Sequence, residues 1–134
     1  MRANGDLTKL ELALALHGVD GAEAEARARE TLSQVGLTDR AGQRVSRLST
    51  GERGRVAIAR ALAPQPTLLL ADEPTSRLDQ ANALVVAGLL ARLARETGAT
   101  IVCATHDPVV IEHADEELKL AAPAAAPAAA AVVA

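Results

Sequence analysis

Two short apolar runs, separated by a segment of helix length, constrain the fold of this chain most. Residues 67–71 read TLLLA and residues 100–104 read TIVCA. Continuous apolar runs of this length predict strands that are buried on both faces. The segment from Gln80 to Glu96 has a helical composition and is followed by Gly98, a typical helix stop. Strand, helix and strand in this order predict a βαβ unit with parallel strands.

The amino-terminal part of the chain predicts two helices. Residues 10–16 alternate leucine with alanine and glutamate, a pattern that fits a strand, but the surrounding Ala, Glu and Lys favour a helix. Asp20 and Glu23 have the spacing of a capping box, in which each side chain satisfies a backbone N–H at the start of a helix. The helix that follows keeps one apolar face until Gly36.

A third helix is predicted before the first strand. Ser49 and Glu52 repeat the capping-box spacing, and Pro64 closes the helix that they begin.

The chain divides into three parts by composition. We expect residues 1–66 to form a helical subdomain and residues 67–120 an α/β core. Within the core, Asp107 begins a short helix and residues 117–120 add an edge strand. Residues 121–134 are a low-complexity Ala/Pro sequence, which predicts a disordered tail.

Composition argues against several classes of protein. Phe, Tyr and Trp are absent, so no aromatic ring can stack on a nucleobase, and a net charge of −3 with interspersed arginines argues against a nucleic-acid partner. Cys103 is the single cysteine, and its apolar flanks predict a buried position in the reducing cytoplasm. Residues 120–134 are too short and too rich in proline to span a bilayer, and no secretory leader is recognised.

Polar side chains follow both predicted strands. Asp72 and Glu73 follow the first strand, and Thr105 and His106 follow the second. Ligands collect beyond the carboxyl ends of parallel strands, so these groups are expected at one rim of the sheet. Two carboxylates and an imidazole there suit the binding of a metal-bound phosphate and the activation of water. Taken singly, the acidic pair also fits a loop start, and the histidine fits a structural or solvated residue.

Three segments carry a family resemblance. Residues 48–62 read LSTGERGRVAIARAL, residues 68–79 read LLLADEPTSRLD, and residues 104–107 read ATHD. Together they resemble the carboxyl-terminal half of the ATP-binding domain of ABC transporters, over most of residues 22–120. The resemblance implies a partial P-loop NTPase-like α/β fold, with a small parallel sheet flanked by helices and a helical signature subdomain. Residues 22–40 most resemble ATPases of the lipoprotein-release and macrolide-export type.

The first segment matches the LSGGQ signature of that family. Thr50 replaces the first glycine and Glu52 the glutamine, whereas Ser49 and Gly51 are retained. The positive end of a helix with a serine hydroxyl suits an anion such as the γ-phosphate of ATP, although Ser49 also fits a simple helix cap. Glu52 adds a negative charge there, which weakens phosphate contact unless its carboxylate turns back to the Ser49 amide.

The other two segments imply further roles. Asp72 matches the Walker B aspartate that binds Mg²⁺ through water, and Glu73 matches the catalytic base. Asp79 ends a segment that resembles the D-loop at the dimer interface, with helix capping as the alternative role. His106 matches the switch histidine that contacts the γ-phosphate. A solvated face is expected for three arginines of the signature helix, which are Arg53, Arg55 and Arg60.

No P-loop is found in this sequence. The pattern GxxxxGK[ST] is absent, and the only lysines, Lys9 and Lys119, follow no glycine-rich loop. Although the family hydrolyses ATP with Mg²⁺, this chain alone is therefore expected to be inactive.

The resemblance implies an ABC transporter ATP-binding subunit, present here as a fragment, that couples ATP hydrolysis to transmembrane transport. Its expected partners are a second ATPase subunit and a permease, at the cytoplasmic face of the cell membrane. Two alternatives stay open: a non-catalytic partner that supplies the signature in trans, and a non-functional truncated remnant. The transported substrate is not readable, because specificity lies in the membrane subunits.

Overall fold

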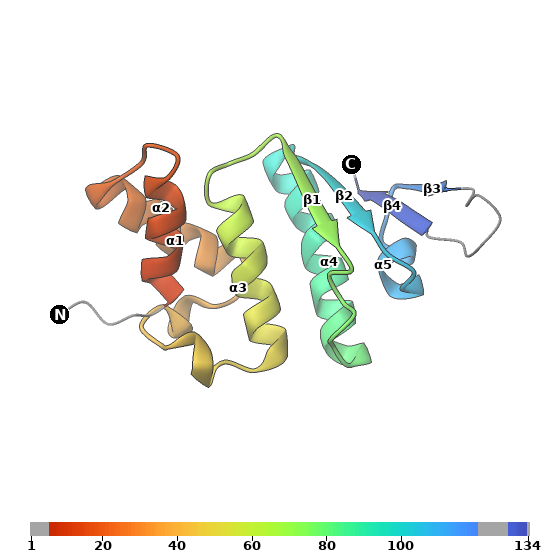
Figure 1. Ribbon diagram of the computed structural model, residues 1–134, viewed down its shortest axis with the longest axis horizontal. Coiled ribbons are helices and arrows are strands. Elements are labelled where there is room, and N and C mark those ends of the chain that lie inside the picture. The colour runs from red at the N-terminus through yellow and green to blue at the C-terminus, as the bar shows by residue number, and fades with distance from the viewer. Residues whose placement is uncertain (1–5, 121–128, 134) are drawn as a thin grey trace. The chain divides into compact units, whose positions relative to one another are not determined.

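The computed structural model describes residues 6–120 and 129–133 (Figure 1). The chain divides into two compact units, Met1–Pro66 and Thr67–Ala134. The described part of the first unit contains helices and no strand, whereas the second combines a four-stranded sheet with two helices.

Three α-helices make the core of the first unit. They are α1 (Asp6–Ala15), α2 (Gly21–Gln34) and α3 (Thr50–Leu62), with 3-10 helices at Thr38–Arg40 and Val45–Arg47. Leu10 and Leu14 of α1 are fully buried, as is Leu32 of α2. Leu12 and Leu16 are exposed. The leucines therefore divide between two faces with helical rather than strand spacing, which confirms the predicted helix.

Both ends of α2 are defined by backbone geometry. Asp20 is the N-cap residue but makes no side-chain cap hydrogen bond, so the predicted capping box with Glu23 is wrong. The Glu23 carboxylate instead pairs with Arg27 one turn further along, at 2.7 Å. Gly36 then adopts a φ of +69°, a left-handed conformation that glycine favours and that stops the helix as predicted.

The second unit is built around a βαβ unit. Its elements are β1 (Leu68–Asp72), α4 (Gln80–Thr97), β2 (Thr100–Ala104), α5 (Pro108–Glu112), β3 (Glu116–Lys119) and β4 (Ala129–Val133). β1 and β2 pair in parallel, with Leu70 opposite Val102. The sheet order is β1-β2-β4-β3, and β4 runs antiparallel to both of its neighbours. The predicted α/β fold with a small parallel sheet is thereby confirmed.

One face of this sheet is buried and carries the core. Ile101 and Cys103 of β2 are fully buried, and α4 packs against β2 through a helix face that includes Leu90. Burial raises the pKa of the Cys103 thiol to about 11.

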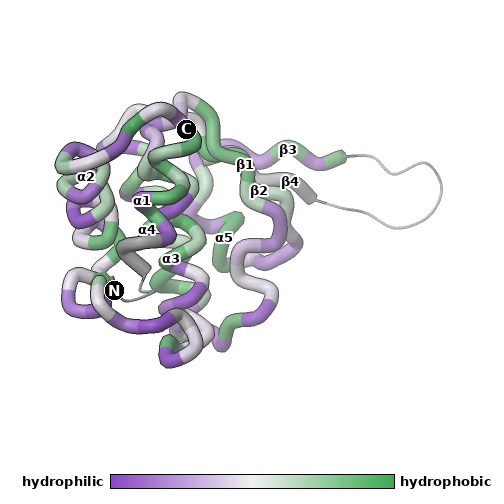
Figure 2. Tube along the Cα trace, turned by 60° about the vertical axis from the view of Figure 1, so that its left-hand side comes forward, coloured by the Kyte–Doolittle hydropathy of each residue, from purple (hydrophilic) through white to green (hydrophobic). Residues whose placement is uncertain are grey.

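The opposite face of β1 is not buried. Leu68 is 52% exposed and Leu70 is 73% exposed, although β1 is hydrophobic along much of its length (Figure 2). The prediction that this strand is buried on both faces is therefore wrong. The apolar run predicted the strand correctly, but burial of its second face needs a covering layer, and no described segment of the second unit supplies one.

The tail differs from expectation where it is described. Residues 129–133 form β4, whereas the Ala/Pro composition predicted disorder throughout residues 121–134. β2 and β3 both offer backbone N–H and C=O groups to a strand between them, and the tail ends in β-branched valines that favour strands. Residues 121–128 and 134 lie outside the described residues.

Among the described residues, no helix combines the length and apolar character needed to cross a bilayer.

We expect the second unit to lose about 2–5 kcal/mol of unfolding free energy on Leu90→Ala, because Leu90 is only 1% exposed and its truncation leaves a cavity. Leu84→Ala on the same helix should cost about 0.5 kcal/mol or less, because Leu84 is 47% exposed. Urea unfolding followed by circular dichroism measures both. Equal losses would show that α4 does not pack as described.

Candidate functional site

The carboxyl ends of β1 and β2 bring the expected acidic and imidazole groups to one rim. Asp72 is the last residue of β1 and pairs with Ala104, and the Glu73 N–H donates to the Ala104 carbonyl at 2.8 Å. Glu73 has a φ of +45°, which costs a residue with a side chain about 1–3 kcal/mol. This turn directs the chain away from β1 directly after the acidic pair.

Glu73 and His106 contact each other directly. His106 Nδ1 lies 2.7 Å from Glu73 Oε1, and Thr105 Oγ1 donates to Glu73 Oε2 at 3.3 Å. When the Glu73 carboxylate is ionised it can only accept, and Nδ1 of His106 is then the donor in this pair. Its Nε2 has no partner among the described residues. The structure thus brings together the two residues that the sequence places in the catalytic step.

Two buried threonines hold the loops that carry this pair. Thr105 is 2% exposed and Thr75 is 3% exposed. Thr75 Oγ1 donates to the Asp107 carboxylate, while the Asp107 N–H donates to Thr105 Oγ1 at 3.0 Å. Asp107 also caps α5 by accepting from the Val109 N–H at 2.9 Å. The loops after β1 and β2 are therefore joined by hydrogen bonds.

Sequence reasoning missed this threonine bridge. Its one signal was that a small hydroxyl residue stands directly before His106 and another stands two positions after Glu73. Neither position predicts a buried side chain, because threonine is mostly found at the surface.

The surroundings of Asp72 show which kind of metal site this carboxylate fits. It is exposed, and its carboxylate forms no hydrogen bond or ion pair with the described residues. Those residues contain no group of three or more His, Cys, Asp or Glu side chains that could hold a metal. Mg²⁺ usually keeps several waters and binds through one or two carboxylates together with phosphate oxygens. A single carboxylate therefore suits an Mg²⁺ that is shared with a nucleotide, rather than a cage made by the protein alone.

Asp79 caps α4. Its Oδ1 accepts from the Asn82 N–H at 2.8 Å, and the Asn82 side chain contacts both carboxylate oxygens. These hydrogen bonds from Asn82 lower the pKa of Asp79, with the backbone N–H contributing most. Asp79 therefore has the helix-capping role that the sequence offered as the alternative, while its role at a dimer interface stays a prediction.

The predicted capping box at the start of α3 is fully formed in the first unit. Ser49 Oγ accepts from the Glu52 N–H at 3.1 Å, and Glu52 Oε2 accepts from the Ser49 N–H at 2.8 Å. A hydroxyl group also has one O–H to donate, and the cap uses Ser49 Oγ only as an acceptor. An exposed donor therefore stands at the positive end of α3, beside the buried Gly51.

The Glu52 carboxylate turns back from the helix end. Besides Ser49, it accepts from Arg40 Nε through Oε1 at 2.9 Å. The Ser49 N–H, first, and Arg40, second, lower the pKa of Glu52. The negative charge of Glu52, which replaces the glutamine of the signature, is thus bound by Ser49 and Arg40. This is the turned-back carboxylate under which the sequence analysis still allows phosphate contact.

Two of the signature-helix arginines are not simply solvated. Arg53 Nη1 donates to the Leu48 carbonyl at 2.6 Å, and Arg55 Nη1 donates to the Val35 carbonyl at 3.2 Å. Arg53 is nevertheless exposed, as expected, whereas Arg55 is half-buried because its long side chain reaches a carbonyl at the end of α2. Arg60 is exposed.

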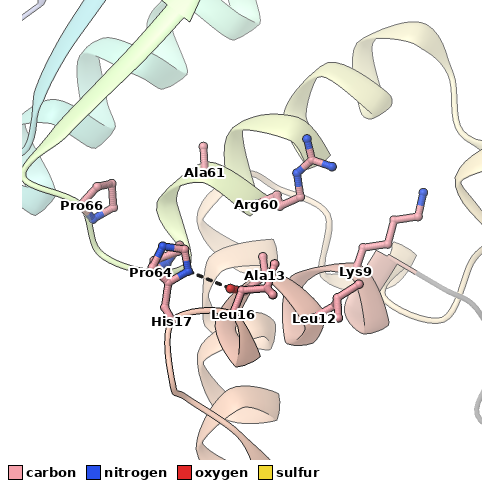
Figure 3. A pocket seen from close by; sticks show the side chains of 9 residues that line it. All are labelled: Lys9, Leu12, Ala13, Leu16, His17, Arg60, Ala61, Pro64 and Pro66. Atoms are coloured by element: carbon pink, nitrogen blue, oxygen red, sulfur yellow. Dashed lines mark hydrogen bonds between the residues drawn. The ribbon is translucent and has the colours of Figure 1, made fainter.

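Arg60 lines a pocket of about 560 Å³ in the first unit (Figure 3). The apolar lining includes Leu12 and Leu16, and His17 Nδ1 donates to the Ala13 carbonyl at 2.9 Å beside it (Figure 3). No residue of the expected site lines this pocket.

Comparison with known proteins supports one family. A family model described as ABC transporter matches residues 2–76. A lipoprotein-releasing system ATP-binding protein of Chromohalobacter salexigens is 42% identical over 114 residues, which are 85% of this chain and 48% of that protein. A methionine import ATP-binding protein of Corynebacterium diphtheriae is 51% identical over 102 residues, which are 76% of this chain and 30% of that protein.

Solved structures agree with these relatives. A dimeric ATP-binding cassette bound to ADP and Pi superposes with a TM-score of 0.70 at 37% identity, and the match covers 84% of this chain and 50% of that one. The chain thus spans about half the length, or less, of the relatives that it matches.

The capping box predicts a pH dependence of stability in the first unit. Because the folded-state pKa of Glu52 lies below its ordinary value of 4.5, ionised Glu52 stabilises the folded chain fully above about pH 4.5. That stabilisation disappears as the pH falls through the lowered pKa. Unfolding followed between pH 2 and 6 should show this loss, and Glu52→Gln should remove it.

Arg40→Gln is the matched control. It deletes the weaker of the two main causes and keeps the Ser49 contact, so part of the pH dependence should remain. An identical profile for Glu52→Gln and the unchanged chain would contradict the capping geometry.

Proposed function

Because the chain belongs to the ABC transporter family, we propose that it is the part of an ATP-binding subunit that carries the signature and Walker B motifs. In the assembled protein this subunit couples ATP hydrolysis to transport across a membrane. The contact between Glu73 and His106 beside Asp72 is the observation that supports this function best. Residues 22–40 indicate an ATPase of the lipoprotein-release type, and the similarity to a lipoprotein-releasing system ATP-binding protein agrees with this.

Glu73 is the proposed general base. Its carboxylate takes a proton from the water that attacks the γ-phosphate, a role that contributes about 10²–10⁴ in rate. His106 and Thr105 each contact one of its oxygens, which fixes the direction of the carboxylate and leaves further lone pairs for the water. Asp72 would hold Mg²⁺ through water, and the bound ion supplies charge neutralisation to the phosphates.

His106 can serve the same site through its second nitrogen. While Nδ1 donates to Glu73, only the imidazolium form can also donate through Nε2 to a phosphate oxygen. Its exposed position, with the ring 81% exposed, leaves that nitrogen accessible to a nucleotide.

The signature end of α3 is proposed to act on a second subunit. The free hydroxyl of Ser49 and the positive helix end would contact the γ-phosphate of an ATP that lies in the P-loop of a partner. Gly51 allows close approach there, and Asp79 would lie at the same dimer interface. A permease completes the assembly at the cytoplasmic face of the membrane.

The phosphate cradle has to come from residues other than these 134. A P-loop supplies backbone N–H groups and a lysine to the phosphates, and no segment of this sequence matches it. Without that cradle, Asp72 is the one expected contact to the nucleotide's metal in this chain.

We therefore expect no measurable binding of Mg-ATP to the isolated chain in a calorimeter, and no release of phosphate. A dissociation constant in the micromolar range would overturn this expectation and would require a phosphate site that the motifs do not reveal.

The intact capping box favours a second candidate function, in which the chain supplies its signature in trans to a complete cassette. Mixed with a full-length homologous cassette, the chain should change that protein's rate of ATP hydrolysis. Ser49→Ala should abolish the change, because it removes the hydroxyl donor. Ser33→Ala, an exposed serine on α2 of the same unit, should leave the change intact. An unaltered turnover of the cassette would count against this role.

A further inference from the structure

Helix α1 has two apolar faces, and only one of them belongs to the core of the first unit. Leu10 and Leu14 are fully buried, whereas Leu12 is 63% exposed and Leu16 is 81% exposed. A surface helix normally turns charged or polar residues to the side away from the core. The exposed leucines of α1 instead line the pocket of about 560 Å³ to which Arg60 also belongs (Figure 3).

The walls of this pocket are apolar and have few hydrogen-bonding groups to satisfy. α3 contributes the small side chain of Ala61, and Pro64 and Pro66 follow that helix. Proline has no N–H, so these two residues add ring surface without a backbone donor. The volume lies within the range of small-molecule sites, which is about 300–1,000 Å³. The pocket therefore has the size and the lining for a short hydrocarbon chain.

Two positive charges stand at this pocket without an acidic partner. Lys9 comes from α1 and Arg60 from α3, and neither side chain forms an ion pair or hydrogen bond with the described residues. None of the described lining residues is acidic. In Figure 3 both charged ends lie apart from His17 and Pro64. An anionic group there meets two cations, and a guanidinium can hold two oxygens of one carboxylate or phosphate.

We propose that this pocket binds a single-chain anionic amphiphile. Its hydrocarbon chain lies against Leu12 and Leu16, and its carboxylate or phosphate head lies against Lys9 and Arg60. A purely apolar ligand leaves the two cations without an anion, and an inorganic anion leaves the leucines in water, whereas an amphiphile satisfies both. The pocket shares no residue with the groups assigned to ATP chemistry, so the proposal does not depend on the proposed function.

The experiment titrates the 134-residue chain with decanoate below the concentration at which decanoate forms micelles. Calorimetry should show saturable one-to-one binding. Acetate has the head group alone, and decyltrimethylammonium has the same chain with a positive head, so each should bind at least about tenfold more weakly. The methyl resonances of Leu12 and Leu16 should shift during the titration. Those of Leu118, an exposed leucine of the second unit, should not.

Substitutions test the two halves of the site separately. Arg60→Gln and Lys9→Gln each remove one charge, so the affinity for decanoate should fall about threefold to tenfold. Leu16→Ser removes apolar contact with the chain and should cost about tenfold. Arg44→Gln is the matched control, because Arg44 is an exposed arginine of the same unit that does not line the pocket. It should bind decanoate as the unchanged chain does, and circular dichroism checks that all four variants fold.

Three results would overturn the proposal: no saturation with decanoate, equal binding of decanoate and decyltrimethylammonium, or unchanged affinity in all three pocket variants. Anionic membranes carry the same head-group chemistry, so vesicles of phosphatidylglycerol form a separate arm of the experiment. Co-sedimentation of the chain with these vesicles, without any binding of free decanoate, would also overturn the proposal. It would assign Lys9 and Arg60 to a membrane surface instead.

Discussion

The parallel pairing of β1 with β2 is the constraint on which the rest of the second unit depends. Its register continues one step beyond the strands, where the Glu73 N–H donates to the Ala104 carbonyl. That bond sets the acidic pair beside the loop that carries His106. A shift of one residue would turn every side chain of β1 to the other face and separate the carboxylates from the imidazole. The same strand pairing therefore fixes both the apolar face of β1 and the position of the acidic residues that follow it.

Much of this arrangement could be predicted from the sequence because it depends on local signals. The capping box of Ser49 and Glu52, the stop at Gly98 and the two apolar runs each use neighbouring residues, and the structure contains all of them. The meeting of Glu73 with His106 needed one further rule, that ligand-binding groups gather at the carboxyl rim of parallel strands.

What could not be predicted depends on partners that sequence spacing alone does not identify. Asp20 and Glu23 have the spacing of a capping box, yet the Glu23 carboxylate pairs with Arg27. Spacing alone does not show whether Glu23 bonds back to the helix start or forward to Arg27. The bridge from Thr75 to Asp107 joins residues that only the sheet brings together. The burial of a strand's second face has the same origin, because composition shows that a face is apolar but not what lies over it.

The buried cysteine has a consequence for the chemistry of the chain as a whole. Cys103 is its single thiol, lies on the face that packs against α4, and has a pKa of about 11, so the reactive thiolate is scarce at neutral pH. While the second unit stays folded, the chain is thereby guarded against air oxidation and against cross-linking into disulfide dimers. Alkylating reagents would reach the sulfur only as the helix lifts from the sheet, which makes this residue a built-in reporter of the integrity of the unit.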